Sequence, residues 1–168
     1  MRLPTASRSD RGRAPMARQA VLGIDPGPAK SAWAIYWPGF SVKQYGHIEN
    51  VQLIGMLHDL SDSVSRIAIE KIESYGMPVG REIFDTVYWT GRFAERLDPI
   101  PVEWIPRKRV VTIICGSSRA KDQNVRQALI DRFGGQEAIR KGGPLYKISG
   151  DVWSALAVAV AIDEQGGT

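Results

Sequence analysis

Three carboxylates stand at the ends of apolar segments in this sequence. Asp25 and Glu70 each close an apolar run, and Asp151 precedes a third run near the C-terminus. Three acids that converge in a partly apolar place cannot all stay ionised without a counter-charge. Oxygen-only ligation favours Mg²⁺ or Mn²⁺ over zinc. A site of this kind can activate water and stabilise the leaving oxygen of a phosphodiester.

Each of these acids also has an ordinary structural interpretation. Asp25 opens an Asp-Pro-Gly sequence, which is a common turn. Glu70 could be a solvated residue at the edge of a sheet. Asp151 follows Ser149-Gly150 and could be a helix N-cap. Spacing alone does not decide between these interpretations and a shared site.

The pattern of apolar residues and breakers predicts an α/β domain. We expect strands at 20–24, 31–37, 40–47, 66–70 and 102–105, and helices from Asn50 as N-cap and at 80–97, 108–114, 121–133 and 151–163. Residues 134–143 are expected to form a flexible link. The first strands are joined by tight turns and the later ones by helices. This order predicts a five-stranded mixed sheet flanked by helices, with the strand ends meeting at one crevice.

Composition limits the class of protein but identifies no partner. The chain has 168 residues, 43% of them hydrophobic, which fits one domain. Apolar runs are too short to span a membrane, and the single Cys115 excludes an internal disulfide or a cysteine zinc cluster. We therefore expect no membrane association and a cytoplasmic setting.

The net charge of +4 resides in the first 18 residues, which hold five arginines and one aspartate, whereas the rest of the chain sums to zero. We expect residues 1–18 to be a disordered basic tail and residues 19–168 to be the folded domain. The tail could be a DNA-contacting arm, an organellar transit segment or sequence upstream of a true start at Met16.

Four segments, in order, resemble the motifs of RuvC-type Holliday junction resolvases, a branch of the RNase H-like nucleases. The matching segments are Val21-Leu22-Gly23-Ile24-Asp25-Pro26-Gly27, Ile67-Ala68-Ile69-Glu70, Arg119-Ala120-Lys121-Asp122-Gln123-Asn124-Val125 and Asp151-Val152-Trp153-Ser154-Ala155-Leu156-Ala157. The resemblance spans Val21 to Ile162, and residues 73–93 look most like phage and prophage members.

The resemblance implies an RNase H-like (RuvC-like) fold and a crossover junction endodeoxyribonuclease that acts as a homodimer on branched DNA. It implies that Asp25, Glu70 and Asp151 bind one or two Mg²⁺ or Mn²⁺ ions and that Lys121 lies near the scissile phosphate. It also implies recombination, or phage DNA processing, as the setting.

DNA contacts are expected from a loop and two basic segments. Tyr75 lies where the family places an aromatic wedge, although a tyrosine in a turn can also pack on the sheet. Arg119 and Lys121 fall in the third motif, although Lys121 could also be an ordinary solvated lysine. Arg107 and Lys108, with Arg109 after them, form a basic run suited to phosphate contact; a solvated helix start is nearly as good an interpretation. Helix 80–97, with Phe84 and Tyr88, could supply the two-fold interface.

One departure from the family pattern concerns the last motif. It usually carries a second acid three residues after the first, and here that place is Ser154. Ser154 could bind a metal-bound water, Glu73 or Asp122 could compensate, or a second metal site could be weakened. His47 and His58 are isolated, and we expect neither to be a ligand.

Three other functions fit parts of the sequence. An RNA-processing nuclease of the same fold shares the core site. A non-catalytic junction-binding protein has Ser154 as its only support. A sugar kinase or actin-like ATPase also has an Asp and Gly after its first strand, but it needs about twice this length.

Overall fold

The computed structural model describes residues 20–39 and 41–166, so the predicted basic tail lies outside the described residues. Along the chain the elements are β1 (Val21–Asp25), β2 (Lys30–Trp37), β3 (Ser41–Glu49), α1 (Asn50–Asp62), β4 (Arg66–Lys71), α2 (Arg81–Leu97), β5 (Val102–Pro106), α3 (Arg107–Cys115), α4 (Asp122–Arg132), α5 (Gln136–Ile139) and α6 (Val152–Gln165).

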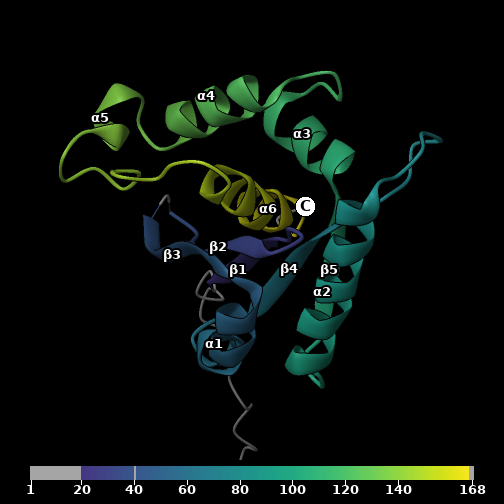
Figure 1. Cartoon of the computed structure of the whole chain (residues 1–168). Coiled ribbons are helices and arrows are strands. Elements are labelled where there is room, and N and C mark those ends of the chain that lie inside the picture. Colours follow the sequence, from purple (N-terminus) through teal and green to yellow (C-terminus); the bar gives the residue numbers. More distant parts are fainter. Residues whose placement is uncertain (1–19, 40, 167–168) are drawn as a thin grey trace, which may run out of the picture.

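The strands form one mixed sheet in the order β3-β2-β1-β4-β5. The pairs β1–β2 and β2–β3 are antiparallel, and the pairs β1–β4 and β4–β5 are parallel. Helix α6 lies against one face, with α3, α4 and α5 beyond it, whereas α1 and α2 lie on the other face (Figure 1). The predicted α/β class and five-stranded mixed sheet are therefore confirmed. Across the described residues, every helix falls short of the length and apolar character needed to cross a membrane.

Two hydrophobic cores sandwich the sheet because side chains alternate along each strand. Leu22, Ile24, Ile67 and Ile69 belong to the core under α1 and α2. Ala32, Ala34 and Ala68 are in the other core, together with most of α6. Helix α6 is apolar on all sides because the sheet covers one side and α3 and α4 cover the other.

Two local predictions were wrong. Asn50 is the first residue of α1 rather than its N-cap, which is Glu49. Its side chain accepts a hydrogen bond from Ser31 Oγ at 2.6 Å and donates one to the Gly27 carbonyl at 2.9 Å. Asn50 therefore braces the turn that follows Asp25.

The second wrong prediction is the flexible link at 134–143, which contains the short helix α5. Ala138 is buried against the core, and its carbonyl accepts a hydrogen bond at 2.8 Å from the backbone N–H of Leu145, which is also buried. Glycines and polar residues dominate this segment, but two apolar anchors suffice to hold it in place.

Candidate active site

Asp25 and Glu70 lie at neighbouring ends of two central strands. The last pair in the parallel register of β1 and β4 is Ile24 with Ile69, so the next residues of the two strands are the two acids. Both acids follow residues that face α1 and α2, and strand alternation therefore turns both toward α6. The prediction that these strand ends lie side by side is confirmed.

Helix α6 brings Asp151 to the same end of the sheet. The helix crosses β1 at Gly23, where a Cβ atom would lie 2.3 Å from the Ala155 carbonyl oxygen and 2.8 Å from the Ala159 nitrogen. Only glycine allows this approach. Asp151 stands one helical turn before Ala155, and Asp25 stands two residues after Gly23, so the close crossing places the start of α6 over the end of β1.

Burial and neighbouring acids act most strongly on Asp25. Burial, together with the negative charges of Glu70, Asp151 and Asp122, raises the pKa of Asp25 to about 8, although the positive charge of Arg107 opposes this shift. Burial also raises the pKa of Glu70 above its ordinary value, again against the influence of Arg107. Two desolvated acids beside further acids are the arrangement expected of a cation site.

The geometry argues against the ordinary structural interpretations of Glu70 and Asp151. Glu70 is 9% exposed and lies on β4, between β1 and β5, so it is not a solvated edge residue. Asp151 occupies the N-cap position of α6 but its side chain makes no capping hydrogen bond. The turn after Asp25 is held by Ser31, whose Oγ accepts a hydrogen bond from the Gly27 N–H at 3.1 Å.

Arg107 lies among these acids. Its Nη1 is 3.5 Å from Glu70 Oε2, and its Nη2 forms an ion pair with Asp122 Oδ1. The register of β4 and β5 explains the contact with Glu70: Ile105 pairs with Glu70, and α3 begins two residues later with Arg107.

The donor chemistry of the site fits a divalent cation. Asp25, Glu70 and Asp151 offer carboxylate oxygens only, which suits Mg²⁺ or Mn²⁺. In the part of the chain that the structure describes, no three His, Cys, Asp or Glu side chains stand close enough together to hold a metal ion as they are placed. The raised pKa of Asp25 is in keeping with a site whose carboxylates would gain from a bound cation.

Sequence reasoning did not place His47 in the site. Ala32 pairs with Asp25 on one side and with His47 on the other, so the three residues form one row across the sheet. His47 Nε2 lies 3.5 Å from Asp151 Oδ2. An isolated histidine on a strand carries no signal in one sequence, because the contact depends on the pairing of β2 with β3.

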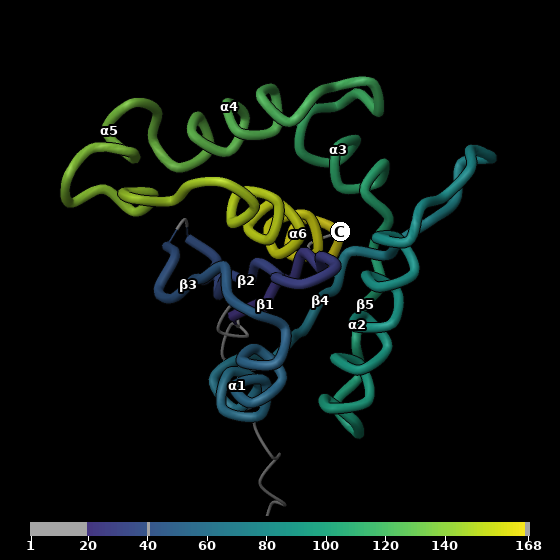
Figure 2. Tube along the Cα trace, in the orientation of Figure 1, coloured from purple at the N-terminus to yellow at the C-terminus, as the bar shows by residue number. Residues whose placement is uncertain are grey.

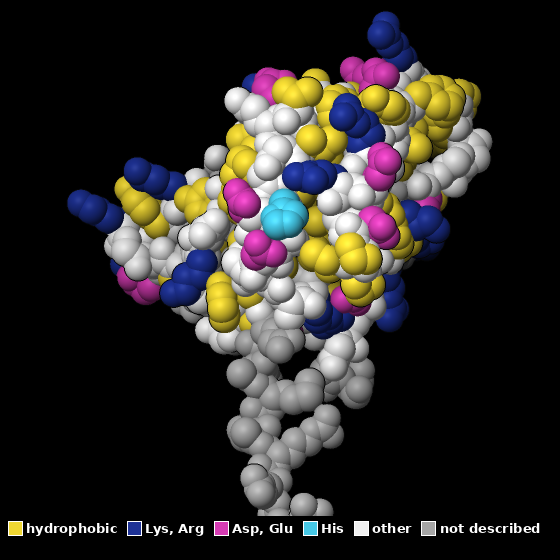
Figure 3. Space-filling view, turned by 90° about the horizontal axis from the view of Figure 1, so that it is seen from below, with side chains coloured by type: hydrophobic (Ala, Val, Ile, Leu, Met, Phe, Trp, Pro, Cys, Tyr) yellow, Lys and Arg dark blue, Asp and Glu magenta, His cyan; other side chains and the backbone are white. Residues whose placement is uncertain are grey.

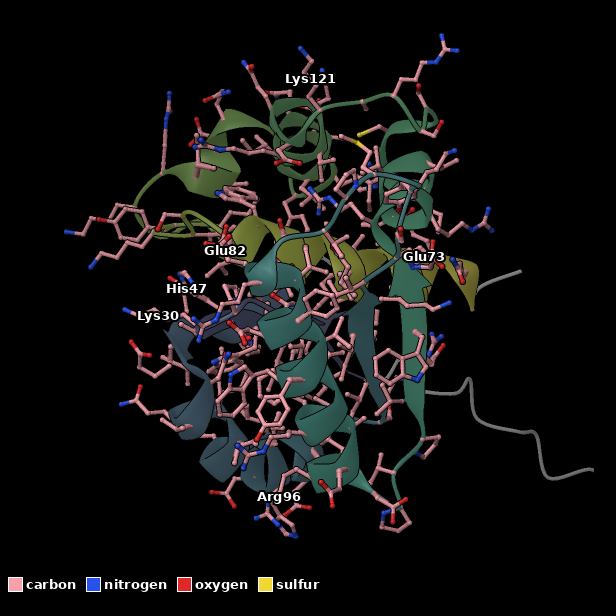
Figure 4. All side chains as sticks on the ribbon, turned by 45° about the vertical axis from the view of Figure 1, so that its right-hand side comes forward. Lys30, His47, Glu73, Glu82, Arg96 and Lys121 are labelled. Atoms are coloured by element: carbon pink, nitrogen blue, oxygen red, sulfur yellow. The ribbon has the colours of Figure 1, made fainter. Side chains whose placement is uncertain are left out.

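Apart from Arg107, the residues expected to contact DNA are exposed. Tyr75 is 61% exposed in the segment between β4 and α2, which projects from the body of the protein (Figure 2). Lys121 is the exposed N-cap residue of α4. It lies well apart from His47 (Figure 4). Arg119 is exposed in the preceding turn, and Lys108 is exposed in the first turn of α3. The structure thus brings Arg107 together with the acids, whereas Lys121, Lys108, Arg119 and Tyr75 are exposed.

A pocket of about 310 Å³ adjoins the acids and includes Ser154 in its lining, together with Arg107, Asp122, Gln123, Val125, Arg126, Gly150, Asp151 and Trp153. Of the two acids considered as compensation for Ser154, Asp122 acts electrostatically on both Asp25 and Glu70. Glu73 instead pairs with Lys71, at 3.1 Å. Asp122 is therefore the better placed of the two.

Surface charge adds little to these assignments. On the face seen in Figure 3, Lys and Arg side chains are interspersed with Asp and Glu side chains. The described part of that face thus offers no continuous basic stripe of the kind that tracks a nucleic-acid backbone. This agrees with the zero net charge of the chain after its first 18 residues.

Comparison with known proteins identifies the fold. Neither a protein-family model nor a curated protein matches the sequence. Among solved structures, Thermus thermophilus RuvC superposes with a TM-score of 0.63 at 15% identity, covering 84% of this chain and 92% of that one. Thermus thermophilus RuvC in complex with a Holliday junction substrate gives a TM-score of 0.64 at 16% identity, covering 85% and 92%. The chain has the RuvC-like form of the RNase H-like fold.

Proposed function

We propose that this protein is a Holliday junction resolvase, a divalent-metal-dependent endonuclease that hydrolyses phosphodiester bonds in four-way or branched DNA. The observation that carries the proposal is the meeting of Asp25, Glu70 and Asp151 at one end of the sheet. The shared fold supports it, since one of the similar structures is RuvC in complex with a Holliday junction substrate. We assign the activity to recombination or phage DNA processing in the cytoplasm of a bacterial or phage-infected cell.

Asp25, Glu70 and Asp151 would hold one or two Mg²⁺ or Mn²⁺ ions. A divalent ion held by these carboxylates would supply a water molecule of lowered pKa and positive charge for the phosphate oxygens. The protein's own part is to keep Asp25 and Glu70 desolvated under α6, so that their charge is directed to the cation rather than to solvent.

Basic and aromatic residues around the site would bind the DNA. Lys121 and Arg119 stand at the start of α4, where a phosphate also gains from the helix N-terminus. Lys108 and Arg107 would contact phosphate from the start of α3. Tyr75, which is exposed on the projecting segment between β4 and α2, would press against bases of the junction.

A second copy of the chain would complete the enzyme, because a four-way junction is resolved by two symmetric cuts. The surface that supports a dimer is on α2, where Ile83, Phe84, Val87 and Tyr88 are all exposed. An apolar pocket between α2 and β5, lined in part by Val87 and Trp104, adjoins it. Exposed apolar side chains gathered in this way indicate an interaction surface.

The test uses purified protein with a labelled four-way junction, a matched linear duplex and an RNA hairpin, each with Mg²⁺, Mn²⁺ or EDTA. Paired, metal-dependent cuts on the junction are expected, and Asp25→Asn should abolish them. Glu73→Gln is the matched control, because Glu73 is an acid three residues from Glu70 that pairs with Lys71 instead. Junction binding without cutting under any metal would mean a non-catalytic junction-binding protein. Cutting of RNA alone would mean an RNA-processing nuclease.

A further inference from the structure

Arg107 occupies an unusual position for a residue expected to contact DNA. Its guanidinium lies between Glu70 and Asp122, and its side chain is only 26% exposed. A guanidinium stays charged at any ordinary pH. The site therefore already contains one permanent positive charge, the Arg107 guanidinium, which contacts both Glu70 and Asp122.

The positive charge acts on the same carboxylates that would bind a metal. Arg107 Nη1 lies 3.5 Å from Glu70 Oε2, an oxygen that would also bind the ion. Like charges repel at short range in a partly buried site. A divalent ion that approaches Glu70 must therefore overcome repulsion from Arg107 and break its contact with Glu70.

Arg107 has a second ion-pair partner besides Glu70. Asp122, whose side chain is 89% exposed, holds the other half of the guanidinium. Both residues line the pocket of about 310 Å³ that also contains Asp151 and Ser154. Arg107 can thus leave Glu70 and remain paired with Asp122 beside open space.

We propose that Arg107 is a positioning residue that serves as the site's built-in counter-cation: it competes with the divalent ion for Glu70 and so sets the affinity of the site for metal. This inference rests on the proposed metal-dependent function. Asp122 has the complementary part, because it draws Arg107 away from Glu70 and favours metal binding.

The experiment measures Mn²⁺ affinity of the full chain without DNA, by electron paramagnetic resonance of free Mn²⁺ at fixed pH. Arg107→Gln should bind Mn²⁺ about tenfold more tightly than the wild type, since a unit charge within a few ångströms is worth roughly one factor of ten or more at intermediate dielectric. Arg107→Lys keeps the charge and should stay near the wild-type affinity. Arg109→Gln removes an exposed charge on the same helix and should change little.

A double-mutant cycle tests the part of Asp122. Asp122→Asn should weaken Mn²⁺ binding in the wild type but have a much smaller effect in the Arg107→Gln background. Equal effects in both backgrounds would mean that Asp122 acts on the metal directly and not through Arg107, which would overturn its assigned part.

Two failures are distinguishable. If the wild type binds no Mn²⁺, or binds it equally after Asp25→Asn, the proposed metal-dependent function fails. If the wild type binds Mn²⁺ but Arg107→Gln binds it with the same or lower affinity, Arg107 merely supports Glu70 and the inference is overturned. Thermal denaturation in EDTA checks that each variant is folded. If Arg107→Gln does not fold, Asp122→Asn, at an exposed position, still gives a test, because an unchanged Mn²⁺ affinity in that variant would overturn the inference.

Discussion

Gly23 on β1 lies directly against Ala155 on α6, so closely that a Cβ atom on Gly23 would stand 2.3 Å from the Ala155 carbonyl oxygen. This crossing point joins the central strand to the buried helix and sets how near Asp151 comes to Asp25. The packing of the domain and the geometry of its candidate site therefore both depend on the absence of a side chain at Gly23.

Gly23→Ala should destabilise the protein by about 1–3 kcal/mol, because the buried backbone of α6 must move away from β1. The loss corresponds to a drop in melting temperature of several degrees, and junction cleavage should fall with it. Gly55→Ala is the matched control. Gly55 is exposed in the middle of α1 with open space around it, so alanine should stabilise the helix by roughly 0.5–1 kcal/mol. Thermal denaturation of both variants measures the difference, and a neutral Gly23→Ala would contradict the close crossing.

The raised pKa of Asp25 predicts a pH dependence of the metal-free protein. Burial and neighbouring acids raise this pKa to about 8, so the folded protein keeps a proton that the unfolded chain releases near pH 4. Between about pH 4 and 8 the folded state binds more protons, and stability therefore falls as pH rises through this window. Glu70 contributes in the same direction.

Asp25→Asn removes the carboxylate that titrates, so the stability of this variant should fall less steeply as pH rises. Melting temperatures in EDTA from pH 5 to pH 8 test this, with the wild type declining more steeply than the variant. Parallel curves would mean that Asp25 is charged throughout the range.

His47→Ala should lower the rate of junction cleavage roughly tenfold or more, because the histidine contacts Asp151 and limits its orientation, as groups beside metal ligands do. The apparent KM for DNA should change little, since His47 lies apart from Lys121 (Figure 4). The other histidine of the chain, His58, is exposed on α1 beside Asp59 and Asp62. His58→Ala should therefore leave cleavage unchanged. An equal effect of both substitutions would argue against a role for His47 in the site.

Phe84→Glu should convert the proposed dimer to a monomer, because the substitution places a charge within the exposed apolar surface of α2. Val51→Glu on α1 is the control, since Val51 and Phe84 are both 65% exposed. Sedimentation velocity distinguishes the two states at equal concentration. A wild-type protein that sediments as a monomer would remove this part of the proposal.

Ser154→Asp should tighten Mn²⁺ binding, because residue 154 lies on the same side of α6 as Asp151, three residues on, and both line the pocket beside the acids. Mn²⁺ titration of the variant gives the result directly. Unchanged affinity and stoichiometry would indicate that the missing second acid of the last motif does not limit metal binding.

The order of elements was predicted from the sequence, and all three candidate acids, Asp25, Glu70 and Asp151, were proposed from it. Apolar strands closed by Asp25 and Glu70 leave each acid at a strand end, and a helix that is apolar on all sides has to be buried. Asn50 was misassigned because its type fits an N-cap, whereas its hydrogen bonds to Ser31 and Gly27 depend on the turn between β1 and β2. The contacts of Arg107 with Glu70 and Asp122 could not be predicted, because these partners lie 37 and 15 residues away in the chain. The basic run around Arg107 therefore indicated only a DNA contact.

His47 shows most clearly what only the tertiary structure decided. Tyr36 pairs with Val42 and Ile35 pairs with Gln44, so Lys43 is an extra residue in β3 and forms a bulge. Without this bulge, Gly46 would stand opposite Ala32, and His47 would face away from α6, because a shift of one residue reverses the face of every side chain that follows. Local patterns in the sequence determine where strands and helices form, but the register of strand pairing and the depth of helix crossing depend on contacts between distant segments. Those contacts placed His47 and Arg107 beside the acids.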